Sequence, residues 1–203
     1  MRSRRAGLIA GCLAVAGVLL LVLVGVPALG TLLTVEHPAE VSDVALVLEG
    51  TGKDAMDVAE RWRTAGLVRD VVVVEAPLKT HALVTYWSDL VARGLAPPAP
   101  TPAPYLHVVR APSTQSAEQA RASLPVLLRL GARSVLAPGG GAIGTRLVER
   151  DLNSVLGQRG IRVLLTRSAG DARDPSRWYT SADDRRAVLD VWLQFLVPWL
   201  SAS

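Results

Sequence analysis

The apolar residues of the chain are grouped in short runs, which are separated by longer segments of mixed polarity. Five runs of four or five residues contain almost no polar side chains: residues 44–48, 71–74, 105–109, 134–137 and 161–165. A half-buried strand alternates polar and apolar residues, whereas a strand covered on both faces is apolar throughout. The runs therefore predict five strands that are buried on both faces of a sheet.

The segments that follow these runs carry apolar residues at helical spacing. We expect helices at residues 53–65, 80–92, 115–130, 143–156 and 182–196. Strands that alternate with helices pair in parallel, and right-handed crossovers place helices on both faces of the sheet. The sequence thus predicts an α/β fold over residues 43–203: a three-layer, doubly wound domain with a mainly parallel five-stranded sheet.

The N-terminal region has the character of a membrane segment. Residues 6–35 carry no charged side chain, and the most apolar part, residues 8–26, is long enough to cross a hydrocarbon core of about 30 Å as a helix. We expect one transmembrane helix at residues 7–33 that anchors the chain in the cell membrane. A cytoplasmic arm at residues 1–6 precedes it, and a stalk at residues 34–42 follows it.

The charges beside this segment predict its orientation. Arg2, Arg4 and Arg5 precede the apolar run, and Glu36 and Glu40 follow it. Because positive charge is retained on the cytoplasmic side, we expect a single-pass protein with its N-terminus in the cytoplasm and its C-terminal domain outside. The alternative is a cleaved signal peptide, although the apolar run is longer than the usual signal core of about 7–15 residues.

The composition excludes several classes of protein. Half of the 203 residues are hydrophobic, which excludes an intrinsically disordered chain. The single cysteine, Cys12, excludes a disulfide framework, and no cluster of His, Asp and Glu has the spacing of metal ligands, so we expect no metal site. Aromatic residues make up 4% of the chain and the body beyond the N-terminal arginines is close to neutral, so we expect no nucleic-acid partner.

The loop after the fourth predicted strand is a candidate anion site. Gly139, Gly140 and Gly141 join this strand to a helix that carries Arg146 near its start. Ligands of doubly wound sheets bind beyond the carboxyl ends of the strands, and backbone N–H groups at a helix N-terminus bind phosphate or carboxylate. The loop lacks the Gly-Lys-Ser/Thr ending of a Walker A motif and is no dinucleotide fingerprint, so it identifies no cofactor. The alternative is a tight turn that needs a flexible backbone.

Two further loops end at the same predicted edge of the sheet. Glu49 and Thr51 follow the first strand, where Glu49 is the first polar side chain beyond a buried run. Ser113, Ser116 and Glu118 lie at the entrance of the helix after the third strand. These residues are candidates for binding a ligand, and we expect Glu118 and Arg146 to share one cleft there. Helix capping is the alternative for each of these loops.

The order of these segments resembles the YdcF-like family. The resemblance is carried by residues 43–50 (DVALVLEG), 61–67 (RWRTAGL), 71–74 (VVVV) and 113–120 (STQSAEQA), and it extends over nearly the whole body. It implies a membrane-anchored or exported α/β domain that is linked to bacterial envelope biogenesis. Binding of a nucleotide-like small molecule is associated with at least one branch of the family, whose reaction is poorly defined.

The chain departs from the family pattern at the positions that would carry chemistry. Glu49 and Thr51 interrupt the Gly-rich end of the first strand, and residues 138–146 lack the family's histidine. The positions that match the family's pattern are Ser113, Ser116, Glu118 and Arg146.

Together these features predict a diverged domain that binds an anionic small molecule or an envelope partner. The alternative is an enzyme that acts on a phosphorylated or glycosylated cell-wall precursor.

Overall fold

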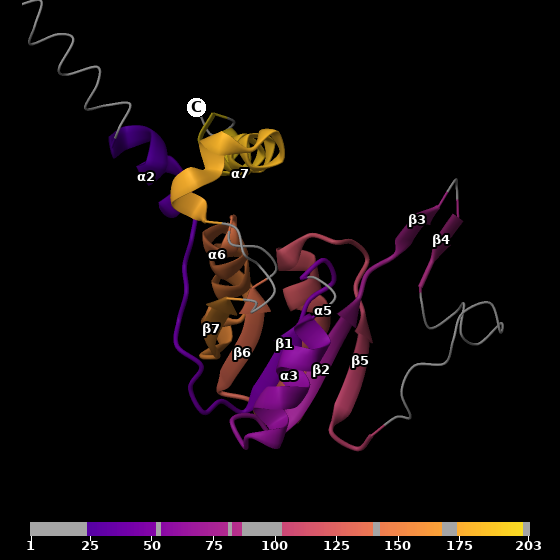
Figure 1. Cartoon of the computed structure of the whole chain (residues 1–203). Helices are drawn as coiled ribbons and strands as arrows, with labels where there is room; N and C mark the ends of the chain where they lie inside the picture. The colour runs from indigo at the N-terminus through magenta and orange to yellow at the C-terminus, as the bar shows by residue number, and fades with distance from the viewer. Residues whose placement is uncertain are drawn as a thin grey trace, which may run out of the picture.

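The centre of the domain is a five-stranded sheet in which every pair of neighbours is parallel. The computed structural model describes residues 24–51, 54–80, 83–86, 103–139, 143–167 and 174–200. The strands are Val44–Val47 (β1), Asp70–Glu75 (β2), Leu106–Arg110 (β5), Ser134–Gly139 (β6) and Arg162–Arg167 (β7). Their order is β5-β2-β1-β6-β7, with β1 in the middle (Figure 1). The five predicted strands and their parallel arrangement are confirmed.

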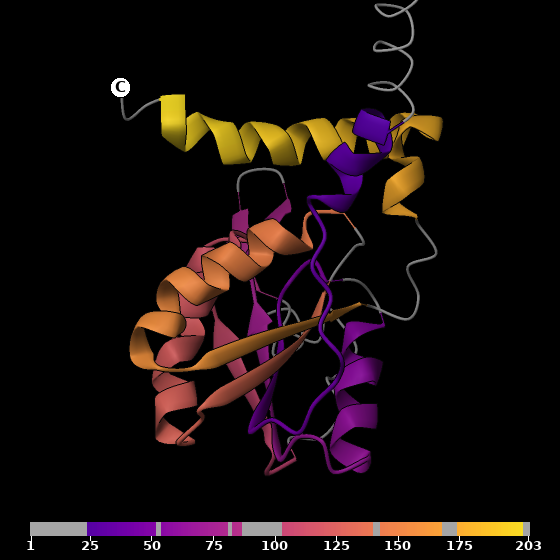
Figure 2. The same cartoon turned by 90° about the vertical axis from the view of Figure 1, so that its left-hand side faces the viewer.

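Helices cover both faces of this sheet. Ala55–Thr64 (α3) lies on one face, and Ser116–Arg129 (α5) and Thr145–Val155 (α6) lie on the other (Figure 2). Successive side chains of a strand point to opposite faces, so β1 sends Ala45 toward Trp62 of α3 and Leu46 toward Leu127 of α5. Both faces carry clusters of buried apolar side chains, and this double burial explains the apolar strands of the sequence.

The helix predicted at residues 80–92 is wrong where the structure describes this segment. Leu78–Thr80 (β3) and Leu83–Thr85 (β4) form an antiparallel hairpin instead (Figure 1). The hairpin contains Thr80, Val84 and Thr85, whose branched β-carbons favour strands over helices. Residues 81, 82 and 87–92 of the predicted helix lie outside the described residues.

The N-terminal part of the described chain packs against its C-terminal part. Val26–Thr31 (α2) lies beside Pro175–Thr180 (η3) and Ala182–Leu200 (α7) at one end of the molecule (Figures 1 and 2). Leu33, Trp178 and Val188 are buried together, and the Trp178 indole Nε1–H donates a 2.7 Å hydrogen bond to the Val26 carbonyl. The last residues of the predicted anchor therefore contact the domain.

Most of the predicted transmembrane helix, residues 7–23, lies outside the described residues. Among the helices that the structure describes, none is long and apolar enough to cross a membrane.

Residues 34–42, the predicted stalk, run along the edge strand β7. The Val35 N–H donates to the Thr145 hydroxyl oxygen at 2.7 Å, and the His37 N–H donates to the Leu165 carbonyl at 2.7 Å. The His37 ring Nε2 lies 2.7 Å from a carboxylate oxygen of Glu149 on α6. The His37 N–H thus gives a hydrogen-bond partner to the Leu165 carbonyl, which an edge strand would otherwise leave unpaired.

Asp43 joins the starts of the two central strands. One of its carboxylate oxygens accepts hydrogen bonds from the Arg133 N–H at 2.8 Å, the Ser134 N–H at 2.9 Å and the Ser134 hydroxyl at 3.0 Å. The bond from the Arg133 N–H is the main cause that lowers the pKa of Asp43, against a smaller opposing effect of burial. The ionised carboxylate thus holds β1 beside β6.

We expect Asp43→Asn to destabilise the fold by about 1–3 kcal/mol at neutral pH, because charge-assisted hydrogen bonds become weaker neutral ones. The pKa of Asp43 is lower in the folded chain than in the unfolded chain. Its stabilisation is therefore complete above the unfolded value of about 3.9 and is lost as the pH falls through the folded value. Urea unfolding followed by circular dichroism measures this difference at each pH.

Asp190→Asn, at an exposed position in the middle of the helix Ala182–Leu200, is the matched control, with an expected change within about 0.5 kcal/mol. A difference between wild type and Asp43→Asn that stays constant from neutral pH to well below pH 4 would contradict the role of the charge.

Candidate functional site

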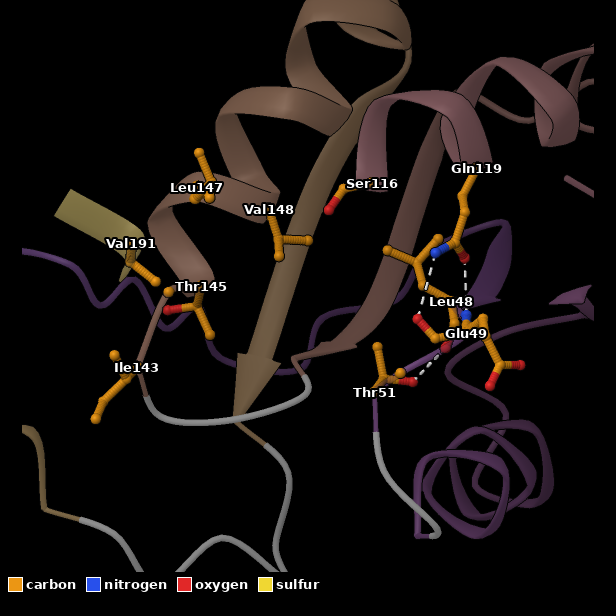
Figure 3. Close-up of a pocket in the computed structure, with 12 residues that line it drawn as sticks. Leu48, Glu49, Thr51, Ser116, Gln119, Ile143, Thr145, Leu147, Val148 and Val191 are labelled. Atoms are coloured by element: carbon orange, nitrogen blue, oxygen red, sulfur yellow. Dashed lines mark hydrogen bonds between the residues drawn. The ribbon is translucent and has the colours of Figure 1, made fainter. Parts of the chain in front are cut away.

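A cavity of about 230 Å³ opens beyond the carboxyl ends of the central strands. The chain passes from β1 to β2 on one side of the sheet and later returns to place β6 on the other side of β1. The boundary between β1 and β6 is therefore the switch point where doubly wound folds bind ligands. The lining residues come from the turn after β1, the starts of α5 and α6, and the middle of α7: Leu48, Glu49, Gly50, Thr51, Ser116, Gln119, Ile143, Gly144, Thr145, Leu147, Val148 and Val191 (Figure 3).

One wall of the cavity is the turn that follows β1. The Thr51 hydroxyl donates to the Leu48 carbonyl at 2.6 Å, and Thr51 itself is buried. Gly50 has a φ of +87°, a left-handed conformation that glycine adopts without steric cost. Thr51 therefore uses its hydroxyl proton to close the turn, and its role in the cavity is to shape the wall.

Gln119 of α5 holds this turn in place. Its side chain is 1% exposed, and its Oε1 accepts a 2.7 Å hydrogen bond from the Glu49 N–H. Its Nε2 donates to the Glu49 carbonyl at 3.3 Å and to the Thr114 carbonyl at 3.0 Å (Figure 3 shows the pair with Glu49). Because the Gln119 amide hydrogen-bonds both the N–H and the carbonyl of Glu49, it fixes Glu49 against α5.

Gln119 was missed by sequence reasoning. The sequence did contain a signal for it. Gln119 precedes Ser123 by four residues and Leu127 by eight, and this helical spacing places all three on the buried face of α5. A polar side chain on a buried face must find partners, and this requirement marks it as structurally or functionally engaged.

Glu49 lies at the rim, and its side chain is exposed. In Figure 3 its carboxylate is turned away from Ser116 and Thr145. The same turn borders a second cavity of about 400 Å³ on the side of α3, which includes Met56 and Val73 among its lining residues. Glu49 is the only ionisable residue among those described as lining either cavity.

The start of α6 forms the opposite wall, and the chain's own backbone uses part of it. Gly144 precedes the helix with a φ of +94°, and a β-carbon there would lie 3.2 Å from a methyl carbon of Val191 on α7. The Arg146 N–H donates to the Leu33 carbonyl at 3.1 Å. The Arg146 side chain is exposed and is not among the lining residues. The first turn of α6 is thus less open to a ligand than the sequence suggested.

Of the predicted site residues, the structure brings Glu49, Thr51 and Ser116 to one cavity. Ser113 and Glu118 do not line it. The Ser113 hydroxyl oxygen accepts a 3.2 Å hydrogen bond from the Gln115 N–H, and Glu118 forms an ion pair with Arg121 on its own helix. Local contacts within the α5 entrance therefore account for these two side chains.

The predicted Gly-rich loop is described at its ends. Gly139 closes β6 and is buried, and a β-carbon at this position would lie 2.9 Å from the Thr166 carbonyl oxygen. Close strand packing thus requires glycine there. Gly140 and Gly141 lie outside the described residues. The neighbouring Thr166 hydroxyl is buried and makes no hydrogen bond with any residue that the structure describes.

The described histidines belong to other parts of the fold. His37 contacts Glu149, and the His107 ring Nε2 lies 3.5 Å from Asp70 at the amino-terminal side of the sheet. No group of three or more potential metal ligands occurs in the described parts of the chain.

The fold and the cavity define a class of protein: a doubly wound parallel α/β domain with a small cavity at its switch point. No protein-family model matches the chain, and no curated protein is similar enough to it to count as a relative.

We expect Gln119→Ala to release the turn after β1, because the Glu49 N–H and two carbonyl groups lose their partner. Such unpaired groups cost about 1–3 kcal/mol when they stay buried. Hydrogen exchange of the Glu49 amide should accelerate markedly, and urea unfolding measures the loss of stability. Gln115→Ala, on an exposed residue before the same helix, should change neither quantity. Unchanged exchange at Glu49 in Gln119→Ala would exclude the bracing role.

Proposed function

We propose that the chain is a diverged, membrane-anchored protein of the YdcF-like type whose domain binds a small ligand of the cell envelope. The observation that carries the proposal is the cavity at the boundary of β1 and β6, where α5 and α6 both begin. Ligand binding at this position is the general rule for doubly wound sheets.

The polar groups at the cavity favour an anionic group on the ligand. Ser116 is the first residue of the 14-residue helix α5, and Thr145 is the first residue of the 11-residue helix α6. The N-terminal turn of a helix carries partial positive charge. At α6 the Arg146 N–H already donates to the Leu33 carbonyl, so the N–H groups of α6 contribute less than those of α5. The Ser116 hydroxyl is directed toward α6, whereas the Glu49 carboxylate is turned aside and does not oppose an anion (Figure 3).

The apolar lining limits the size and kind of ligand. Ile143, Leu147, Val148 and Val191 form the wall opposite the β1 turn. A volume of about 230 Å³ is small for a ligand site, since drug-sized ligands occupy about 300–1,000 Å³. A phosphate or carboxylate with a short apolar attachment fits this description, and a larger envelope precursor would insert only one end.

Binding is favoured over catalysis by the residues that line the cavity. Glu49 is the only ionisable residue among the described residues that line the cavity, and no described histidine accompanies it. General acid–base catalysis by one exposed carboxylate lacks the second positioned group that most mechanisms need. The alternative, an enzyme acting on a phosphorylated or glycosylated cell-wall precursor, requires Glu49 to turn into the cavity.

Isothermal titration of the full-length protein with inorganic phosphate, glucosamine 1-phosphate and UDP-N-acetylglucosamine tests the binding site. We expect Ser116→Leu to weaken binding roughly tenfold to hundredfold, because a charge-assisted hydrogen bond of about 1.5–3 kcal/mol is lost and the cavity is partly filled. Ser113→Leu and Arg146→Ala should leave the affinity within about twofold, since neither side chain lines the cavity. Absence of binding to all three probes, or equal effects of the two leucine variants, would contradict the site.

The proposed anchor predicts a defined orientation. With Arg2, Arg4 and Arg5 on the cytoplasmic side, the domain and its C-terminus lie outside the membrane. Protease added to intact spheroplasts of a bacterial expression host should digest the domain and remove a C-terminal tag. A tag that is degraded only after the cells are lysed would show the reverse orientation or a cytoplasmic protein.

A further inference from the structure

Helix α7 has two apolar sides, of which one packs on the domain. Val188, Val191, Trp192 and Phe195 lie on this inner side, against α2, η3 and the start of α6. The Trp192 indole Nε1–H donates to the Leu29 carbonyl at 3.2 Å, and the guanidinium of Arg150 lies 4.7 Å from the centre of the Phe195 ring. These contacts fix how α7 is rotated about its own axis.

The other apolar side is open. Leu189, Leu193 and Leu196 are 56%, 58% and 49% exposed, and their spacing of four and three residues places them in one row along the helix. We call this row the leucine stripe. Single exposed leucines are common on protein surfaces, but an aligned row on one helix indicates contact with an apolar partner.

Basic residues extend the stripe toward the start of α7. Arg185 and Arg186 precede Leu189 by four and three residues, so they lie on the same side of the helix, and both are exposed. The Arg185 guanidinium also donates a 2.8 Å hydrogen bond to the Tyr179 carbonyl. Asp183 and Asp190 are seven residues apart and lie together on the neighbouring flank. The stripe therefore carries positive charge at its N-terminal end, although α7 as a whole has three aspartates and two arginines. Leucines beside arginines are one feature of helices that lie on anionic membrane surfaces.

The place where the apolar N-terminal run joins the domain indicates which apolar partner lies close to α7. Helix α2 lies beside α7 at the same end of the molecule, and its neighbours Val24 and Leu32 are 61% and 49% exposed (Figures 1 and 2). The sequence directly before Val24 is the uncharged apolar run of the proposed anchor. A chain anchored through that run holds α7 next to the membrane surface.

We propose that the leucine stripe of α7 lies in the interface of a membrane that contains anionic lipids. The inference rests on the proposed anchor for its geometry, and on the leucines and arginines of α7 for its chemistry. The domain is then held against the bilayer at two places, by the anchor and by α7, and it does not swing freely on a stalk.

A second copy of the chain fits the stripe less well. Three leucines extend over two helical turns, whereas a coiled-coil seam needs about three to four heptads. In a parallel pair, Arg185 and Arg186 would also face the same residues of the partner, which is unfavourable.

Lipid quenching at single residues tests the contact in the full-length chain. In a Cys12→Ser background, Leu193→Cys and the matched control Gln194→Cys are labelled with an environment-sensitive fluorophore and reconstituted in phosphatidylcholine–phosphatidylglycerol vesicles that contain doxyl-labelled lipid. We expect several-fold stronger quenching at position 193 than at position 194. Omitting phosphatidylglycerol, or adding Arg185→Glu and Arg186→Glu, should reduce quenching at 193.

The outcomes separate this inference from the anchor. Alkaline carbonate extraction of the wild-type chain reports the anchor alone. An anchored chain with equal quenching at 193 and 194, or one in which Leu193→Cys oxidises to a disulfide-linked dimer in vesicles, overturns the contact and leaves the anchor standing. A chain that is extracted by carbonate but quenched at 193 at neutral pH overturns the anchor only, and a chain that binds no vesicles overturns both.

Discussion

The burial of β1 is the constraint on which the rest of the structure depends. Its four residues, Val44–Val47, are at most 7% exposed, and parallel strands flank it on both sides. A strand in this position needs helices on both faces of the sheet and polar partners at both of its ends. Asp43 supplies the partner at the start, where it accepts hydrogen bonds from residues 133 and 134, and Gln119 supplies it just beyond the end through Glu49.

These two polar side chains act by different physical means. Asp43 works through charge, so its contribution depends on pH, and its lowered pKa keeps it ionised to a lower pH than in the unfolded chain. Gln119 works through the geometry of a neutral amide whose donor and acceptor meet the carbonyl and N–H of one residue. Because it is buried, its hydrogen bonds do not compete with water, and the turn that lines the cavity is held in one conformation.

At the carboxyl end of the sheet, the chain's own segments use polar groups that the proposed ligand would also need. Residues Leu33 and Val35 bind the start of α6, which reduces the number of its polar groups that a ligand can reach. Val191 of α7 lines the cavity, and it lies on the side of α7 opposite to the flank that carries Leu193. If α7 lies on a membrane as proposed, the cavity is close to the membrane surface, and its ligand would be met there.

The sequence by itself determined the elements whose signal is local. Continuous apolar runs indicated the five strands, because a strand that is buried on both faces is apolar at nearly every position. Apolar residues at helical spacing indicated α3, α5, α6 and α7. It predicted a helix from residue 80 where the structure has the β3–β4 hairpin, because helical spacing and β-branched residues give conflicting signals there. It placed Glu49, Thr51 and Ser116 at one edge, yet it could not assign Gln119 a partner 70 positions away or show that Leu33 occupies the N–H of Arg146. Those contacts join segments that are distant in sequence, so only the tertiary structure decided which polar groups remain available to a ligand.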